Sequence, residues 1–110
     1  MSFSATHEQD VLVISVEGQL IVANRQELKQ RVLDALTDGE RKFVIDFSET
    51  GYIDSSGLGV LVSVSKKIRE LGGELRLSGL NEDLRVLFEL TKLDTLFHIS
   101  ETKSEALSSV

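Results

Sequence analysis

Two serines beside two glycines form the part of the sequence best suited to chemistry. The stretch Asp54–Gly59 reads DSSGLG, follows the apolar run KFVIDF and opens the run VLVSVSKKIREL. A serine hydroxyl at such a junction is suited to three uses: nucleophilic attack, contact with a bound phosphate, or acceptance of a phosphoryl group from another enzyme. A purely structural interpretation also exists, because small polar residues begin helices well.

Nucleophilic and metal-dependent chemistry are disfavoured. A catalytic serine needs a general base within hydrogen-bond reach, and the sequence offers only His7 and His98. We expect His7 in a loose N-terminal segment and His98 packed within the apolar run LFHIS. The chain has no cysteine, and Asp46, Glu49 and Asp54 lack the histidines or repeated acidic spacing of a metal site. We therefore predict no catalytic residue and no metal ligand.

Modification of the motif fits its position best. The glycine spacing matches neither the Walker A pattern nor the dinucleotide fingerprint, so we expect no cofactor. Ser55 is expected at the N-cap or first turn of a helix, where backbone N–H groups are unpaired. A phosphate there adds about −1.5 to −2 charges at a point where the helix dipole tolerates them. A partner surface that accepts a neutral hydroxyl would then face an unpaired charge beside Asp54, which predicts a binding switch.

The outer side of the same helix is the predicted partner surface. Four residues lie away from the expected core stripe at 3.6 residues per turn: Ser56, Val60, Ser63 and Lys67. Val60, with the edge of Val64, would give a modest apolar patch near Ser55. The alternative is that Val64 lies in the core and Val60 is a lone exposed apolar residue, which is common.

Alternating strand and helix patterns must position this motif. Strand-like runs are expected at residues 2–6, 11–18, 42–47, 74–78 and 96–99, and helical runs at 24–36 and 55–71, after Asn81, and as a turn at the C-terminus. Asn24 and Glu27 form a predicted capping box. The expected core stripe of the second helix contains Leu58, Leu61, Ile68 and Leu71. Strands joined through helices are usually parallel, which predicts one α/β domain over residues 1–110 with a mainly parallel or mixed sheet.

The overall charge restricts the class of partner. The net charge is −6, with 18 acidic and 12 basic residues, which argues against binding to nucleic acid or to an anionic membrane. No apolar run approaches the roughly 20 residues that cross a bilayer, and the N-terminus lacks the pattern of a signal peptide. A mildly acidic surface is compatible with a protein partner or with simple solubility. We therefore expect a cytoplasmic protein that does not insert into a membrane.

The motif and its surroundings resemble a known family. Residues 51–97 read GYIDSSGLGVLVSVSKKIRELGGELRLSGLNEDLRVLFELTKLDTLF and closely resemble the STAS domain of bacterial anti-sigma-factor antagonists. The matching features are the D-S-[STA]-G-L-G motif, a Gly-Gly before a strand, and a helix with Leu-Phe before a final L-x-x-x-F; VEGQL resembles the family's earlier G-x-L. The resemblance implies an α/β STAS fold, a mixed sheet of about five strands packed by about four helices.

The resemblance also implies a partner-switching role. Such antagonists bind an anti-sigma factor with serine kinase activity, are switched off by phosphorylation of the serine after the motif Asp, and are restored by a type 2C protein phosphatase. By position, Ser55 is the phosphoacceptor, with Ser56 as the fallback. Asp54 is the adjacent motif acid. Gly57 and Gly59 would allow close approach of the partner's backbone.

One part of the sequence departs from the family pattern. Many relatives carry an acid after G-x-L, whereas this chain has Ile21 and Val22 there. Either the partner differs, or this edge is recognised by apolar contact. The alternative function within the family is that of a constitutive STAS subunit of a membrane transporter or a regulatory scaffold.

Overall fold

Strands and helices alternate along the chain in the computed structural model, which describes residues 3–110. The elements are β1 (Phe3–Glu8), β2 (Val11–Leu20), α1 (Arg25–Thr37), β3 (Lys42–Ile53), α2 (Ser55–Glu70), β4 (Glu74–Ser78), α3 (Glu82–Leu90), a 3₁₀ turn (Leu93–Thr95), β5 (His98–Ser100) and α4 (Lys103–Ser109). The predicted α/β class is confirmed, with a mixed sheet and four helices over these residues.

The five strands form one sheet in the order β1-β2-β3-β4-β5. β1 is antiparallel to β2, and every other neighbouring pair is parallel. Because α1 and α2 connect parallel strands, they begin at the same edge of the sheet, where β2 and β3 end. That shared edge places the DSSGLG motif beside the loop that follows β2.

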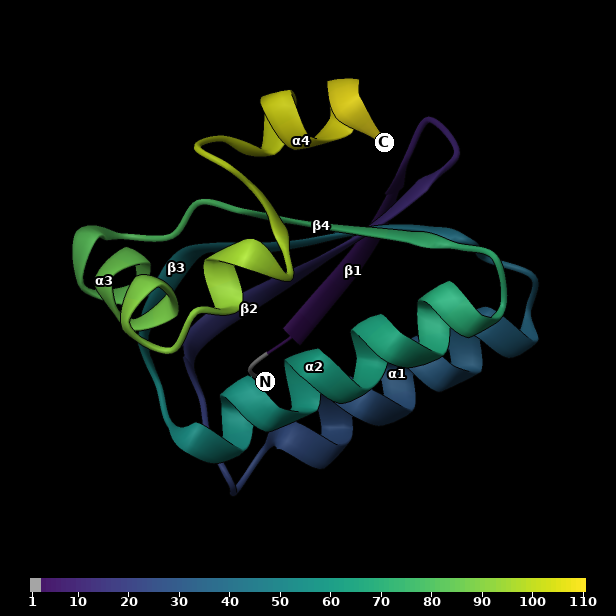
Figure 1. Ribbon diagram of the computed structural model, residues 1–110. Helices are drawn as coiled ribbons and strands as arrows, with labels where there is room; N and C mark the ends of the chain where they lie inside the picture. Colours follow the sequence, from purple (N-terminus) through teal and green to yellow (C-terminus); the bar gives the residue numbers. More distant parts are fainter. Residues whose placement is uncertain (1–2) are drawn as a thin grey trace.

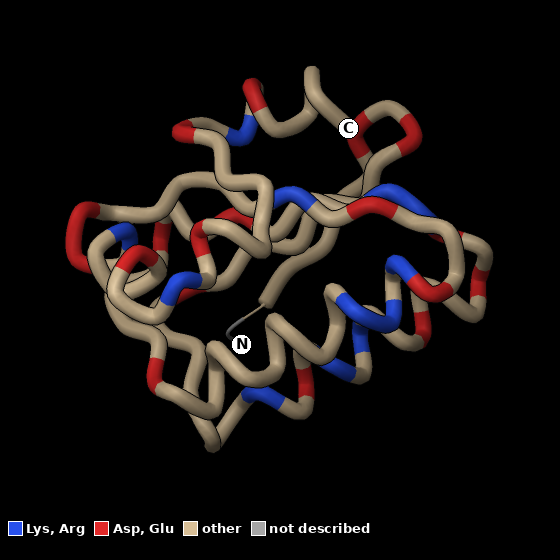
Figure 2. The backbone as a smooth tube through the Cα atoms, in the orientation of Figure 1, with Lys and Arg blue, Asp and Glu red and all other residues tan. Residues whose placement is uncertain are grey.

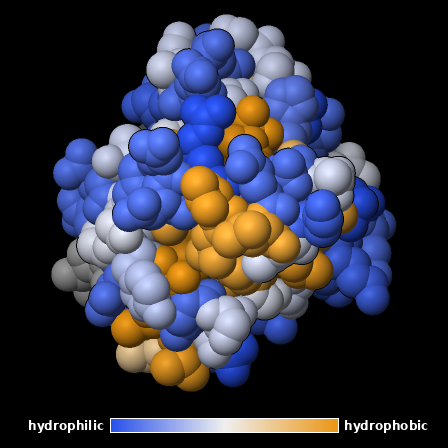
Figure 3. Space-filling model, turned by 60° about the vertical axis from the view of Figure 1, so that its left-hand side comes forward, coloured by the Kyte–Doolittle hydropathy of each residue, from blue (hydrophilic) through white to orange (hydrophobic). Residues whose placement is uncertain are grey.

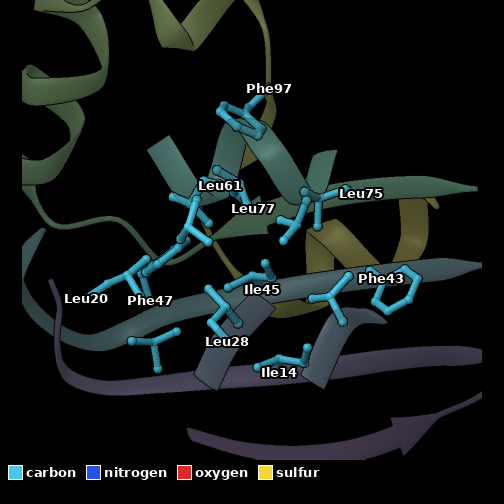
Figure 4. Close-up of a cluster of buried hydrophobic side chains, with 14 of the residues drawn as sticks. Ile14, Leu20, Leu28, Phe43, Ile45, Phe47, Leu61, Leu75, Leu77 and Phe97 are labelled. Atoms are coloured by element: carbon cyan, nitrogen blue, oxygen red, sulfur yellow. The ribbon is translucent and has the colours of Figure 1, made fainter. Parts of the chain in front are cut away.

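The helices cover the two faces of the sheet unequally. Figure 1 shows α1 and α2 side by side on one face, α4 on the other, and α3 near one end. The larger core lies under α1, α2 and α3 and includes Ile14, Phe43, Ile45 and Phe47 (Figure 4). A small second cluster under α4 contains Val11, Val13, Val44 and Ala106. Most of the burial therefore supports the layer that carries α2.

The predicted strand boundaries were correct for β4 and too short at the C-terminal ends of β1, β2 and β3. The run 74–78 is confirmed, whereas β2 continues to Leu20 and β3 to Ile53. The predicted strand 96–99 was wrong at its start, because Leu93–Thr95 turns before β5 begins at His98. The edge strand predicted at 2–6 is β1, and Ser2 lies outside the described residues.

Several local expectations also need correction. Asn24 and Glu27 form no capping box, because the Asn24 amide accepts from the N–H of Ile21 at 2.8 Å and donates to the carbonyl of Gln19 at 2.9 Å. Leu71 is 44 % exposed because it lies just beyond the end of α2.

The N-termini of α3 and α4 are capped by side chains. The predicted cap of the third helix is confirmed, since Asn81 accepts from the N–H of Leu84 at 2.8 Å. A capping box that we had not predicted joins Thr102 and Glu105 at the start of α4. The C-terminal segment is therefore a capped helix of seven residues rather than a turn.

Both histidines differ from expectation. His7 lies in β1, where its ring pairs with the carboxylate of Glu40, and not in a loose segment. His98 is exposed on the short edge strand β5 and is not packed in the core. The apolar neighbours of His98 suggested burial, but an edge strand of three residues leaves one side chain facing solvent.

Candidate functional site

The DSSGLG motif forms the junction between β3 and α2. β3 ends at Ile53 and α2 begins at Ser55, so Asp54 is the N-cap residue, with extended backbone. An Asp at the N-cap satisfies helix N–H groups that have no intrahelical acceptor, and its negative charge complements the helix dipole. The local sequence thus fixes where α2 begins, and it places Ser55 in the first turn, as predicted.

The carboxylate of Asp54 ties two segments together. One oxygen, Oδ1, accepts from the N–H of Gly57 at 2.7 Å, and the other, Oδ2, accepts from the N–H of Val22 at 3.0 Å. The backbone N–H of Asp54 donates to the carbonyl of Leu20 at 3.1 Å. The start of α2 and the loop after β2, 32 residues apart in sequence, therefore form one surface.

Ser55 is the exposed hydroxyl of this surface. It is the first residue of α2, and its side chain makes no hydrogen bond within the described chain, residues 3–110. In the same part of the structure, the N–H groups of Ser55 and Ser56 have no protein acceptor. Ser56 is half-buried. An anion on Ser55 would meet the positive end of the helix dipole and two free N–H donors, so the fold tolerates it.

The two glycines of the motif have different roles. A Cβ on Gly57 would lie 2.4 Å from the carbonyl oxygen of Leu20 and 2.8 Å from the Ile53 side chain. Gly57 is buried, so the expectation that it allows close approach of a partner was wrong: it allows β2 to approach α2. A Cβ on Gly59 would meet nothing within 4 Å, so Gly59 is open to an incoming surface.

The loop after β2 contributes an apolar edge to the site. Val22 is 62 % exposed and Ile21 is half-buried, and the hydrogen bond from Val22 to Asp54 holds them beside α2. Asn24 closes this loop through its bonds to Ile21 and Gln19. Asn24 is the residue that sequence reasoning missed here, because an Asn before a helical run reads as a cap unless the side chain's own partners are known.

Two predicted contact residues on α2 lie elsewhere. Val60 is only 2 % exposed, so the apolar patch predicted there was wrong. α2 packs against the sheet and also against α1 (Figure 1). More of its surface is therefore buried than the single apolar stripe that the sequence predicted. Ser63 is half-buried and lines a groove between α1 and α2. It lies about 12 Å along the helix from Ser55, at 1.5 Å per residue.

The arrangement around Ser55 suits modification better than catalysis. His7 lies at the opposite end of β2, paired in register with Leu12, and His98 lies on β5, so neither ring is beside the hydroxyl. Both oxygens of Asp54 are committed to backbone N–H groups. Among residues 3–110, no group of three His, Asp or Glu side chains is placed to hold a metal ion. No helix of the same range is long and apolar enough to cross a membrane.

The fold and the motif together define a STAS domain. The family model described as "STAS domain" matches residues 2–106, so the chain belongs to the STAS family. This agrees with the sheet order, with α2 following the longest strand, and with the motif at the start of that helix.

Similar proteins are named anti-sigma factor antagonists. The anti-sigma-B factor antagonist of Staphylococcus aureus is 29% identical over 101 residues, which cover 92% of this chain and 94% of that protein. The crystal structure of TM1081 from Thermotoga maritima superimposes with a TM-score of 0.92 at 33% identity, covering 98% of this chain and 93% of the other. An anti-sigma factor antagonist from Mycobacterium paratuberculosis gives 0.88 at 26% identity, covering 98% and 92%. These homologues are regulatory proteins.

Proposed function

We propose that this protein is an anti-sigma-factor antagonist controlled by phosphorylation of Ser55. In its unphosphorylated form it binds an anti-sigma factor that is also a serine kinase, and a type 2C protein phosphatase restores binding after modification. The observation that carries the proposal is the exposed Ser55 hydroxyl at the first residue of a helix whose start is fixed by Asp54. The proposal places the protein in the cytoplasm, where ATP is available to such a kinase.

The chemistry of the switch requires no catalytic group from this chain. The kinase transfers the γ-phosphoryl group of ATP to Oγ of Ser55: a P–O bond forms at the serine, the bond to ADP breaks, and the hydroxyl proton passes to a base of the kinase. This chain contributes a fixed acceptor. We expect it to have no enzymatic turnover of its own.

The phosphate acts on binding and leaves the fold intact. Ser55 and Ser56 have free N–H groups that can donate hydrogen bonds to an anion, so α2 stays folded. The partner, which had packed against a neutral hydroxyl, then faces a dianion beside Asp54. Bringing that charge into an interface without a matching cation is unfavourable, so the partner dissociates.

The proposed partner surface comprises Asp54, Ser55, Ser56 and Gly59 with the apolar edge formed by Ile21 and Val22. The exposure of Val22 and the openness around Gly59 support it. Where many relatives carry an acid, an apolar edge is expected to meet an apolar patch on the partner. The partner of this chain is therefore expected to differ from the partners of relatives that carry an acidic residue at this position.

The test combines phosphorylation with binding to a candidate kinase-type anti-sigma factor. Incubation with the kinase and ATP followed by peptide mass spectrometry should place the phosphate on Ser55. Ser55→Ala should bind with affinity close to wild type, and Ser55→Asp should bind at least about tenfold more weakly. Ser104→Asp is a matched control, because it adds the same charge at an exposed position in the first turn of α4.

Three outcomes would contradict the proposal. Phosphate on Ser56 alone would move the switch to the neighbouring hydroxyl. Equal loss of binding in Ser55→Asp and Ser104→Asp would show a general charge effect. Binding that is independent of the state of Ser55 would point to a constitutive STAS subunit.

A further inference from the structure

A basic groove lies between α1 and α2, away from the Ser55 surface. Its volume is about 380 Å³, and it is lined by the side chains of Lys29, Leu33, Ser63, Val64, Lys66, Lys67 and Glu70. Leu33 is half-buried, whereas Val64 is only 1 % exposed, so Leu33 is the aliphatic residue that offers apolar surface in the groove; the charged residues of the lining are the three lysines and one acid, Glu70. None of these lysines takes part in an ion pair within the described residues.

The groove stands out because the chain as a whole is acidic. The net charge is −6, yet half of the 12 Lys and Arg residues lie on two helices: Arg25, Lys29, Arg31, Lys66, Lys67 and Arg69. Figure 2 shows these basic segments along α1 and α2, with acidic segments more frequent over the rest of the chain. Such segregation of charge creates one surface that attracts an acidic partner.

The same chain carries a surface of the opposite character on α3. Glu82, Val86, Glu89 and Leu90 are spaced i, i+4, i+7 and i+8, so they share one side of the helix. Val86 is 44 % exposed and Leu90 is 77 % exposed. On the face of the molecule that carries α3, Figure 3 shows a contiguous apolar patch bordered by hydrophilic residues.

The basic residue of α3 does not neutralise the glutamates on this side of the helix. Arg85, the basic residue of α3, pairs with Glu101 at 3.6 Å, while Glu82 and Glu89 have no ion-pair partner in the chain between residues 3 and 110. The outer side of α3 is therefore an acidic amphipathic helix surface. Its apolar residues have no partner in the isolated chain, and such patches commonly mark interaction sites.

We propose that the groove between α1 and α2 binds α3 of a second copy of this chain. The two surfaces are complementary in charge and in apolar character. The groove has three lysines and one glutamate around Leu33, and α3 has two glutamates around Val86 and Leu90. The spacing agrees, since Lys29 and Leu33 are four residues apart on α1, as are Glu82 and Val86 on α3. This is the helix-in-groove mode of recognition.

The proposed contact has a defined symmetry. Each copy offers one groove and one α3, so the contact is heterologous and runs head to tail. One helix in a groove buries less area than a standard stable interface, so the association is reversible and weak. Since opposite charges supply much of the attraction, it weakens as salt is added. Ser55 lies in neither surface, so this inference does not depend on the proposed switch.

Sedimentation velocity over a series of protein concentrations tests the proposal. At about 20 mM NaCl the average sedimentation coefficient should rise with concentration, and at about 0.5 M NaCl it should stay at the monomer value. Lys67→Glu and Glu89→Lys should each raise the dissociation constant at least about fivefold. Lys103→Glu is the matched control, because Lys103 is exposed on α4, on the opposite face of the sheet from the groove, and belongs to neither surface. Circular dichroism confirms that each variant is folded.

A mixing experiment distinguishes this contact from a general effect of charge. An equimolar mixture of Lys67→Glu and Glu89→Lys should associate to within about twofold of wild type. The unaltered groove of Glu89→Lys meets the unaltered α3 of Lys67→Glu, and the two reversed residues attract each other in the other contact. The proposal is overturned by a monomer at every concentration in low salt, by equal weakening in Lys103→Glu, or by no recovery in the mixture. Phosphorylation of Ser55 is measured separately, so a failure here leaves the proposed function unaffected.

Discussion

Two aspartates eight residues apart, Asp46 within β3 and Asp54 just beyond it, organise different parts of this molecule. Asp46 is 8 % exposed, and its oxygens accept from the hydroxyls of Ser78 at 2.8 Å and Ser48 at 2.5 Å. Asp54 is half-buried, and both of its oxygens accept from backbone N–H groups. One carboxylate joins side chains within the sheet, and the other joins two chain segments at its edge.

The difference bears on the switch proposed at Ser55. Around Asp46 each donor is a serine hydroxyl already used in the network, and Ser78 is fully buried. Around Asp54 the backbone is fixed while the neighbouring hydroxyl of Ser55 stays free and exposed. Rigid surroundings with one unused polar group provide a reproducible surface whose charge can change without altering the fold.

The largest effect is expected from filling the space beside either aspartate. A Cβ on Gly79, which has φ of +77°, would lie 2.8 Å from Oδ1 of Asp46, and Gly57 has the backbone clash described above. Gly79→Ala and Gly57→Ala should each lower the free energy of unfolding by about 2–4 kcal/mol. Gly59→Ala is the control, because its space is open and Ala favours a helix, so it should gain about 0.5–1 kcal/mol. Urea unfolding measures all three, and equal effects at Gly57 and Gly59 would contradict the assigned packing.

Removal of the internal carboxylate should have the next largest effect. Asp46→Ala leaves the buried hydroxyl of Ser78 without its acceptor, which costs about 1–3 kcal/mol of stability. Because the two side chains form one contact, the double variant with Ser78→Ala should lose less than the sum of the single losses. A double-mutant cycle by urea unfolding checks this. Additive losses would mean that the network does not act as a unit.

Removal of the edge carboxylate should have a smaller effect on stability that is concentrated at the site. Asp54→Ala removes an N-cap and should cost about 1–2 kcal/mol. Hydrogen exchange of the Val22 and Gly57 amides should accelerate more than exchange in the β-sheet core. Ser55→Ala should change stability by less than about 0.5 kcal/mol, because its side chain supports nothing in the fold. Uniformly faster exchange in Asp54→Ala would show that Asp54 supports the whole domain rather than the edge.

The smallest effect is expected at the ion pair that joins α4 to β1. The hydrogen bond from Lys103 to Glu8, with the attraction of that carboxylate, raises the pKa of the Lys103 ammonium, and the charge of Asp46 adds to this. A lysine whose pKa is higher in the folded state than in the unfolded state stabilises the fold at pH values below the unfolded-state pKa. This contribution is lost as the pH rises through the folded-state pKa. Lys103→Met should therefore slightly lower the melting temperature at pH 7. The difference from wild type should disappear at strongly alkaline pH, and Lys92→Met should show no such difference.

The sequence predicted the alternation of elements well because apolar periodicity reports directly on burial. β4, the N-cap of α3 and the start of α2 near Ser55 all follow from local signals of this kind. The errors came from contacts between distant segments. The burial of Val60 depends on α1, the fit of Gly57 depends on the carbonyl of Leu20, and the role of Asn24 depends on the path of its loop. None of these contacts can be predicted from the spacing of residues that are close in sequence.

The position of Ser55 on a capped helix also determines how a modifying enzyme can recognise this residue. An unfolded peptide can be drawn into an active site as an extended strand, whereas Ser55 is held in helical backbone by the bonds that Asp54 makes to Gly57 and Val22. An enzyme that modifies Ser55 must therefore recognise a folded surface assembled from two segments. A short synthetic peptide spanning residues 50–60 is expected to be a poor substrate, and unfolding of the domain would abolish recognition while leaving the serine fully accessible.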